Sequence, residues 1–233
     1  MLLTAGEAEA VKPIGSDHVR HDADGSLMAL VEGSVFQAGP GNTPPLWLPA
    51  YYIDVYPVSN QEYAQFVAAT GHHAPRHWTD GMSPPELADH PVVFVTWTDA
   101  AAYAEWVGKT LPTSQQWEKA ARGTRGAIYP WGDQATPPLS ATFGRTGVGN
   151  TSARDCYLSG GSPYGVHDLC GNVWEWCSSE TSPGRYELKG GAWTSPLCPR
   201  HAVVVQRRGS EHVRRRHRIP LCRSGLNPPR GCT

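Results

Sequence analysis

Residues 111–123 read LPTSQQWEKAARG, and this stretch decides much of the fold. Thr113 is followed three residues later by Gln116, which is the spacing of a capping box, where each residue satisfies a backbone amide near the start of a helix. Trp117 and the two alanines after it fall on one helical face, and Gly123 suits the helix end. The stretch therefore predicts a short helix with one buried face.

Two further helices carry similar signals. Ser59 and Glu62 form a second capping box, and the apolar residues after them share one face before Gly71, so this helix should end near residue 70. Asp99 is a preferred N-cap residue and precedes another amphipathic stretch, which ends at Gly108. We therefore expect three short helices in the first half of the chain.

The strands are less clearly marked than the helices. Short apolar runs at 27–31 and 34–36 predict a hairpin, and a third run at 51–55 predicts another strand. Residues 1–25 have no hydrophobic period, which indicates a tail or a peripheral loop. Between residues 129 and 193 Gly, Pro, Ser and Trp dominate, so we expect mainly loops held in place by large aromatic side chains.

The composition favours a loop-rich fold over a helix bundle, since 25 Gly and 21 Pro occur among 233 residues. No apolar stretch approaches the roughly 18–20 residues of a membrane span, and the first ten residues lack the basic and apolar regions of a signal peptide. The six cysteines form no Cys-x-x-Cys pair, which fits free thiols in a reducing compartment. We expect a protein that is cytoplasmic as synthesised.

The near-zero net charge conceals an uneven distribution. Residues 189–233 carry ten basic side chains and one acid, whereas residues 1–188 carry ten basic and twenty acidic side chains. An arginine run such as that at 214–218 is one signature of nucleic-acid binding. The acidic body of the chain is a nearer partner for this basic end, so we rank nucleic acid below an intramolecular role.

Four motifs carry a family resemblance: LPTSQQWEKAARG at 111–123, YPWGD at 129–133, YGVHDLCGNVWEW at 164–176 and KGGAW at 189–193. In this order they resemble the signature of the formylglycine-generating, sulfatase-modifying enzyme family. The resemblance implies an α+β fold of the C-type-lectin-like class, in the formylglycine-generating-enzyme subtype, with short antiparallel strands, two or three helices and much ordered loop. It implies one lectin-like domain over 26–233. A fold of this kind does not fix a function.

The resemblance also implies a structural calcium site. The matching family positions bind calcium through two side chains, here Asp168 and Glu175, and two main-chain carbonyls, here those of Gly171 and Val173. Several hard oxygen ligands at flexible geometry suit this ion. The alternative is that both carboxylates accept backbone amide hydrogen bonds in the same curl of chain.

The catalytic cysteines of the family are replaced in this chain. Family oxidases use two cysteines because a thiolate pair suits copper(I), but the matching positions are Ser195 and Arg200. Cys198 lies between them and cannot form the pair alone; we interpret it as a loop thiol rather than a nucleophile. We therefore expect no copper and no catalytic residue.

Iron is not expected either. The related ergothioneine-type sulfoxide synthases place iron on three histidines supplied partly by an additional N-terminal helical domain, for which this chain has no room. His72, His73, His77 and His90 are interpreted as solvated loop residues, because Pro75 would disrupt a helix that aligned His73 with His77. A metal site at these histidines stays open as the alternative.

The segment after Trp193 has an unusual composition. Residues 194–205 follow no period of 2 or 3.6, and each of them can be written by a codon that ends in a pyrimidine. This pattern resembles the variable proteins of diversity-generating retroelements, which use the same lectin-like subtype and randomise a C-terminal segment. The variable region would span 194–223. The expected ligand-binding residues are Thr194, Ser195, Leu197, Cys198, His201, Val203, Val205, Arg207, His212, Arg214, Arg216 and Arg218.

Two functions remain open at this point. The first is a non-catalytic binder that recognises a protein or cell-surface ligand through the variable face, and acts at a virion or cell surface if it is exported. The second is an oxidase of protein cysteine or a related thiol, which the missing cysteine pair opposes. Decay of an ordinary family member, or an altered reading frame at the tail, is the alternative explanation of the C-terminal segment.

Overall fold

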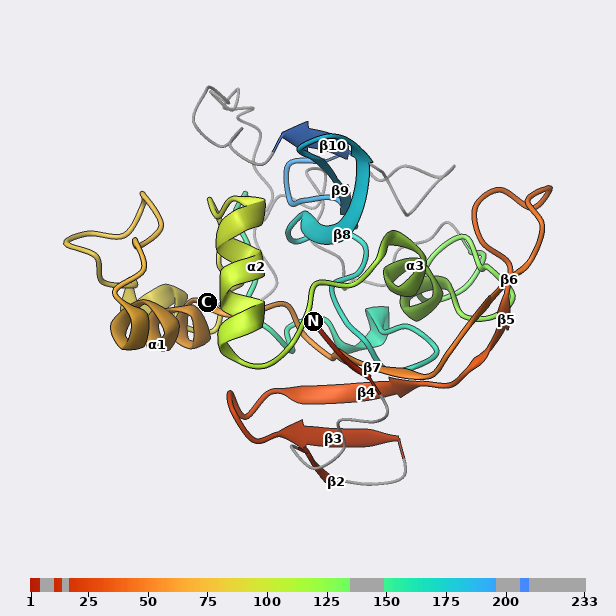
Figure 1. The fold of residues 1–233 in the computed structure, drawn as a ribbon, viewed down its shortest axis with the longest axis horizontal. Helices are drawn as coiled ribbons and strands as arrows, with labels where there is room; N and C mark the ends of the chain where they lie inside the picture. The colour runs from red at the N-terminus through yellow and green to blue at the C-terminus, as the bar shows by residue number, and fades with distance from the viewer. Residues whose placement is uncertain (5–10, 14–16, 135–148, 196–205, 210–233) are drawn as a thin grey trace.

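The computed structural model describes residues 1–4, 11–13, 17–134, 149–195 and 206–209. Its largest element is an antiparallel sheet (Figure 1) with the strand order β1-β7-β4-β3-β2. These strands are β1 (Leu2–Thr4), β7 (Tyr51–Asp54), β4 (Leu27–Val31), β3 (His18–His21) and β2 (Val11–Pro13). A smaller sheet joins β10 (Gln206–Gly209), β9 (Arg185–Lys189) and β8 (Glu175–Ser182), and β5 (Ser34–Phe36) pairs with β6 (Leu46–Leu48).

The strand β4 forms the middle of the large sheet because it pairs with both β3 and β7. Ala29 lies opposite His18 on one side and Ile53 on the other. Met28, Ala29 and Val31 are fully buried. The sequence of a central strand that is buried on both faces is a continuous run of apolar residues. Residues 27–31 form such a run, which is why the sequence predicted a strand there.

The described residues within 1–25 do not form a tail or a peripheral loop, in contrast to the prediction from the sequence. They supply β1, β2 and β3 to the large sheet, and Val19 and His21 of β3 are buried. The buried residues of β3 alternate with polar ones over only four positions. An alternation over four residues is too short to be told from chance. The histidine on the buried face also hides the alternation of apolar and polar residues that marks a strand in a sequence.

The predicted hairpin between 27–31 and 34–36 is also wrong. The strand β5 pairs with β6, with Val35 opposite Trp47, and not with β4. Gly33 lies where the chain passes close to another segment, because a Cβ atom there would lie 3.1 Å from the backbone nitrogen of Ala50. The glycine therefore marks a close backbone approach and not a hairpin turn.

The three predicted helices are confirmed as α1 (Asn60–Thr70), α2 (Trp97–Trp106) and α3 (Ser114–Arg122). Ser59 and Thr113 cap α1 and α3 through complete capping boxes. The N-cap of α2 is Thr96, and Asp99 is the third helical residue, which returns the capping bond. The prediction from the sequence had placed Asp99 at the N-cap. The error arose because an acidic side chain suits both the N-cap and the third helical position of a capping box.

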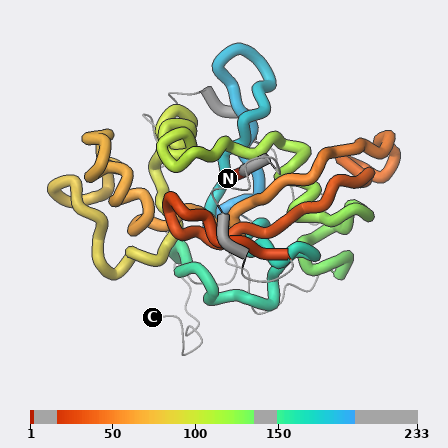
Figure 2. The backbone as a smooth tube through the Cα atoms, turned by 60° about the horizontal axis from the view of Figure 1, so that its bottom comes forward, coloured from red at the N-terminus to blue at the C-terminus, as the bar shows by residue number. Residues whose placement is uncertain are grey.

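Residues 129–193 are mostly loop where the structure describes them, with a short 3-10 turn η3 (Leu158–Gly160) and the β8–β9 hairpin. A further 3-10 turn, η2 (Pro85–Leu87), lies between α1 and α2. The hairpin was missed because β8 reads EWCSSETS, which is polar along most of its length. The β8–β9 hairpin projects from the body of the molecule in both views, while α1 and the β5–β6 pair lie at opposite ends (Figures 1 and 2).

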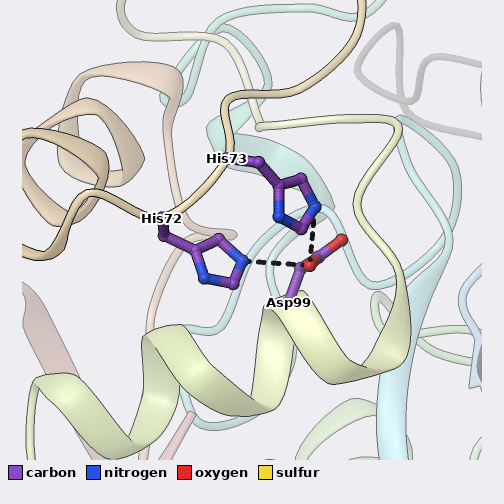
Figure 3. A group of neighbouring side chains, drawn as sticks. All are labelled: His72, His73 and Asp99. Carbon is purple, nitrogen blue, oxygen red and sulfur yellow. Dashed lines mark hydrogen bonds and ion pairs between the residues drawn. The ribbon is translucent and has the colours of Figure 1, made fainter.

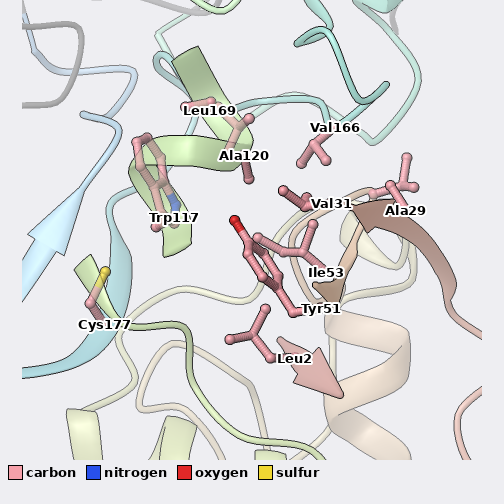
Figure 4. Close-up of a cluster of buried hydrophobic side chains, with 12 residues drawn as sticks. Leu2, Ala29, Val31, Tyr51, Ile53, Trp117, Ala120, Val166, Leu169 and Cys177 are labelled. Carbon is pink, nitrogen blue, oxygen red and sulfur yellow. The ribbon is translucent and has the colours of Figure 1, made fainter. Parts of the chain in front are cut away.

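The main hydrophobic core lies between the large sheet and α3. Trp117 of α3 is fully buried and belongs to one cluster with Tyr51 and Ile53 of β7 and with Leu169 of the loop region (Figure 4). The hydroxyl of Tyr51 donates a 2.6 Å hydrogen bond to the Gln116 carbonyl, so the large aromatic side chains also satisfy polar groups. Helix α3 thus joins the sheet to the loops.

A buried lysine adds a polar tie within the same body. The Lys109 ammonium donates hydrogen bonds to Asp24 at 2.7 Å, Asp54 at 2.8 Å and Ser26 at 2.6 Å. The two carboxylates hold the pKa of Lys109 above its usual value despite burial. Across the described part of the chain, no helix combines the length and the apolarity that crossing a membrane requires.

Candidate functional site: a buried acidic curl beneath the C-terminal segment

The C-terminal segment starts from two glycines that touch the core. Gly190 and Gly191 have φ angles of 94° and 95°, which side-chain-bearing residues rarely adopt. A Cβ atom at Gly190 would lie 3.3 Å from the Trp117 ring and 3.6 Å from the Val173 carbonyl oxygen. The Gly190 carbonyl accepts a 3.1 Å bond from the Gly171 amide. The start of the segment is therefore packed tightly against α3 and the loop at 168–175.

A turn follows the glycines. The Ser195 amide donates to the Ala192 carbonyl at 2.7 Å, and the Ser195 hydroxyl accepts from the Ala192 amide at 3.1 Å. The Trp193 amide donates to the Asn172 carbonyl at 2.9 Å. Thr194 at the tip of the turn is exposed, and Ser195 is partly buried. The turn thus binds back to the curl, while one side chain faces solvent.

Only part of the expected ligand-binding set can be placed. Thr194 and Ser195 lie together on the turn, and the backbone of Arg207 lies in β10, opposite Glu187 of β9. The other expected residues fall outside the described residues: Leu197, Cys198, His201, Val203, Val205, His212, Arg214, Arg216 and Arg218.

The expected calcium ligands surround a tight curl of chain. Asp168 and Asn172 have φ angles of 59° and 57°, so two residues with side chains adopt the left-handed region. The Asn172 side chain donates to Asp168 at 3.1 Å and to the Ser152 carbonyl at 3.1 Å, and accepts from the Ser152 amide at 3.0 Å. Sequence reasoning missed Asn172; the signal was an asparagine after glycine, a residue type that tolerates positive φ.

Among the described residues, the two acids of the curl form no ion pair, and the positive charge of the N-terminus offsets the effect of burial on Glu175 only in part. Burial raises the pKa of Asp168 to about 6 and that of Glu175 to about 7, and the charge of Asp168 adds to the rise at Glu175. The Glu175 Oε2 atom accepts a 3.0 Å bond from the Trp117 indole, while its Oε1 atom is buried without a hydrogen-bond partner. A cation between them would supply the missing charge.

The chemistry of these residues is compatible with the expected calcium site. The bonds of both carboxylates come from side chains, those of Asn172 and Trp117, and not from backbone amides. The unpartnered oxygen of Glu175 and the carboxylate of Asp168 are hard donors of the kind that calcium prefers. The main-chain oxygen of Val173 lies next to Gly190, 3.6 Å from where a Cβ atom of that residue would be.

The replaced catalytic positions have other surroundings. The hydroxyl of Ser195 closes a turn, as described above, whereas Arg200 and Cys198 lie outside the described residues. Cys177 is fully buried in β8, and burial raises the pKa of its thiol well above the usual range. A thiol of this kind is neither a nucleophile nor a ready metal ligand at neutral pH.

Comparison with known proteins identifies the family. The model of the sulfatase-modifying factor enzyme 1-like domain matches residues 17–219. A formylglycine-generating enzyme of Thermomonospora curvata is 34% identical over 194 residues, with 60% of this chain and 63% of that protein covered. An inactive C-alpha-formylglycine-generating enzyme 2 of Bos taurus is 36% identical over 163 residues, with 63% and 54% covered.

A relative from Chlamydia pneumoniae, named serine/threonine-protein kinase pkn1, is 31% identical over 205 residues, with 78% of this chain but 32% of that protein covered. The chain spans about a third of the length of the first curated relatives it matches. Names of active and inactive enzymes both occur among the relatives.

Two solved structures share the fold at low sequence identity. Treponema denticola variable protein 1 matches with a TM-score of 0.62 at 16% identity, over 86% of this chain and 93% of that chain. PvdO from Pseudomonas aeruginosa matches with a TM-score of 0.62 at 19% identity, over 81% and 90%. The α+β, C-type-lectin-like fold expected from the sequence is thereby confirmed. The chain belongs to the family of sulfatase-modifying factor enzyme 1-like domains.

Proposed function

We propose that this protein is a non-catalytic ligand binder that presents a sequence-variable surface at its C-terminal segment, as the variable proteins of diversity-generating retroelements do. One observation carries the proposal. Ser195 stands at the first cysteine position of the family oxidases, and its hydroxyl closes a turn with the Ala192 amide. Arg200 stands at the second position. The thiolate pair that binds copper(I) is therefore missing.

The scaffold around the segment supports this function. Before the segment, the chain is attached through the Gly190 and Trp193 backbone bonds to the curl. After residue 205, β10 returns the chain to β9 by antiparallel strand pairing. Attachments made by backbone atoms do not depend on side-chain identity. Such a frame tolerates extensive side-chain replacement in the segment that it holds.

Exposure at the start of the segment agrees with a binding surface. Thr194 is exposed, and it is the first residue after the fixed KGGAW motif. A segment that is rewritten at random must contribute little to the core, because buried substitutions of arbitrary size cost several kcal/mol and stability is small. The ligand class is a protein or another cell-surface molecule.

Calcium has a structural part in this proposal. Asp168, Glu175 and the carbonyl oxygens of Gly171 and Val173 would hold the ion, which would supply positive charge between two buried acids. The curl itself anchors the turn of Trp193 and the backbone of Gly190. The ion therefore rigidifies the floor of the binding surface and takes no part in a reaction.

The DNA around the coding sequence tests the function directly. A neighbouring reverse-transcriptase gene, together with a near-copy of the codons for 190–223 that differs only at adenines, is the expected result. The absence of both from the complete source genome would contradict the variable-surface function and favour decay of an ordinary family member.

Oxygen uptake tests the oxidase alternative, for which the similarity to the T. curvata enzyme is the supporting observation. We expect no copper-dependent oxygen consumption with a cysteine-containing peptide, whereas an active family member run in parallel consumes oxygen. The matched control is Cys198→Ser. Uptake that the wild-type chain shows and this variant loses would mean that the lone thiol is catalytic and that the binder proposal fails.

A further inference from the structure

Two histidines and an aspartate that do not belong to the acidic curl meet at one point (Figure 3). The Nε2 atoms of His72 and His73 lie 3.0 and 3.1 Å from the same oxygen, Oδ1, of Asp99. One ligand atom from each of the three residues lies within 4.8 Å of the others. In the described part of the chain this is the one such group of three. Nitrogen and carboxylate donors converge here from separate elements.

The local sequence explains why both rings face the same way. Gly71 ends α1 in the left-handed conformation, with a φ of 72°, and the Thr70 hydroxyl accepts from the His72 amide at 3.2 Å. The His72 ring then lies 4.8 Å from the Phe66 ring, and the His73 ring stacks on it at 4.4 Å between centroids. The turn and this stack fix two consecutive side chains on one side.

The carboxylate is fixed independently. The Oδ2 atom of Asp99 accepts the Thr96 amide at 2.7 Å as part of the capping box of α2, which leaves Oδ1 for the histidines. Asp99 is 7% exposed, whereas His73 is 73% exposed, so the group is anchored at its base and open at its top. This is the arrangement of a preorganised site that solvent can reach.

We propose that His72, His73 and Asp99 bind a divalent metal ion of the zinc class, with a position left open for water. Zinc bonds to imidazole nitrogen and carboxylate oxygen at about 2.0–2.2 Å, which places neighbouring ligands of a tetrahedral site about 3.3 Å apart. The two nitrogen–oxygen separations of 3.0 and 3.1 Å need to widen by only a few tenths of an ångström, and the two histidine nitrogens, which lie within 4.8 Å of each other, would have to take up the same spacing. Two nitrogens and one oxygen suit zinc better than calcium or copper(I).

The Asp99 carboxylate supplies the negative charge that a bound cation needs. The start of α2 opposes a cation with the equivalent of about half a positive charge, but the Asp99 carboxylate carries a full negative charge at closer range. A purely structural role of the histidine–aspartate pairs accounts less well for the convergence of the three side chains. Asp99 already accepts its capping bond, and an ion pair with the exposed His73 contributes little to stability.

The test uses the full chain without a histidine tag, in excess calcium so that the acidic curl is saturated. Calorimetry with Zn²⁺ should give one site per chain, and Co²⁺ should give the visible bands of a tetrahedral ion. His73→Ala and Asp99→Asn should each weaken Zn²⁺ binding by at least about tenfold, since even outer-shell changes have effects of that size. Asn at position 99 can still accept the Thr96 amide, so the helix cap survives.

The matched control is His90→Ala, which removes a histidine bonded to Thr151 and leaves the group intact. It should bind Zn²⁺ like the wild-type chain. The exposed His73 lets its variant keep the melting temperature of the metal-free protein, so lost binding cannot be ascribed to unfolding. The metal site would be overturned if the wild-type chain did not bind Zn²⁺, or if all variants bound it with equal affinity. The three residues would then form only two structural ion pairs.

Discussion

Replacement of Glu175 by Gln should stabilise the metal-free protein and abolish its stabilisation by calcium. In the metal-free protein, burial raises the pKa of Glu175 from 4.5 to about 7. Each pKa unit corresponds to about 1.4 kcal/mol, so ionisation of the buried carboxyl at pH 8 costs the folded state about 3 kcal/mol. The uncharged Gln avoids this cost and can still accept the hydrogen bond from the Trp117 indole.

The pH dependence follows from the sign of the shift. A carboxyl whose folded pKa is raised has no effect on stability below its unfolded pKa, near 4.5, where both states are protonated. Stability is then lost as the pH rises towards about 7, because only the unfolded state releases its proton freely. Asp168, with a pKa raised to about 6, acts in the same direction. Calcium should cancel this loss by neutralising both acids.

Thermal melting at pH 5 and pH 8, with calcium or with chelator, measures these effects. At pH 8 with chelator, Glu175→Gln should melt about 6–12 °C above the wild-type chain, using about 2–4 °C for each kcal/mol. Calcium should raise the melting temperature of the wild-type chain by mass action and leave the variant unchanged.

Glu180→Gln is the matched control, since it makes the same change at an exposed position of the same strand, β8. It should respond to calcium as the wild-type chain does. If chelator leaves the wild-type melting curve unchanged at pH 8, and calorimetry detects no calcium binding, the curl is held by hydrogen bonds alone and the calcium proposal fails.

Three further substitutions test the scaffold by thermal or urea unfolding. Gly190→Ala should lower the free energy of unfolding by about 1–3 kcal/mol, because it forces alanine into a positive φ and places a methyl group against Trp117. The control, Gly41→Ala, adds its methyl group in open space and should be neutral. Equal effects of the two changes would refute the close packing at Gly190. Lys109→Met should cost about 3–5 kcal/mol, because it removes the ammonium shared by two buried carboxylates and leaves Asp54 only the N-terminal amine and Asp24 only His21 as ionic partners; a neutral result would argue against that network. Any substitution of exposed Thr194 should shift the melting temperature by no more than about 2 °C, and a collapse of the fold would exclude a variable surface there.

The sequence predicted the features whose signals are local. The capping boxes at Ser59 and Thr113 set two helix starts correctly, because hydroxyl, amide and carboxylate groups three residues apart determine that geometry without tertiary help. The first strands were missed because β1 and β2 have three residues each, and β1 pairs with β7, which lies far along the chain. Strand pairing over such distances leaves no periodic trace in a short segment.

The candidate sites, too, were predicted where the signal is local and missed where it is not. The acidic curl at 168–175 is one continuous motif, so the family resemblance could locate Asp168 and Glu175. His72 and His73 were assigned to solvated loops because their partner, Asp99, lies in α2, 27 residues beyond His72, and only the folded chain brings the three together. Asn172 was overlooked because its importance comes from a left-handed backbone and from bonds to Ser152, neither of which sequence spacing reveals.

Trp117 connects parts of the molecule that have little else in common. Its ring lies in the core with β7, its indole nitrogen bonds Glu175, and Gly190 packs against its edge. Loops with little regular structure of their own usually open independently, at free energies well below that of global unfolding. Here the loop region shares its central contact with the sheet, so the loops and the sheet should come apart in one cooperative transition.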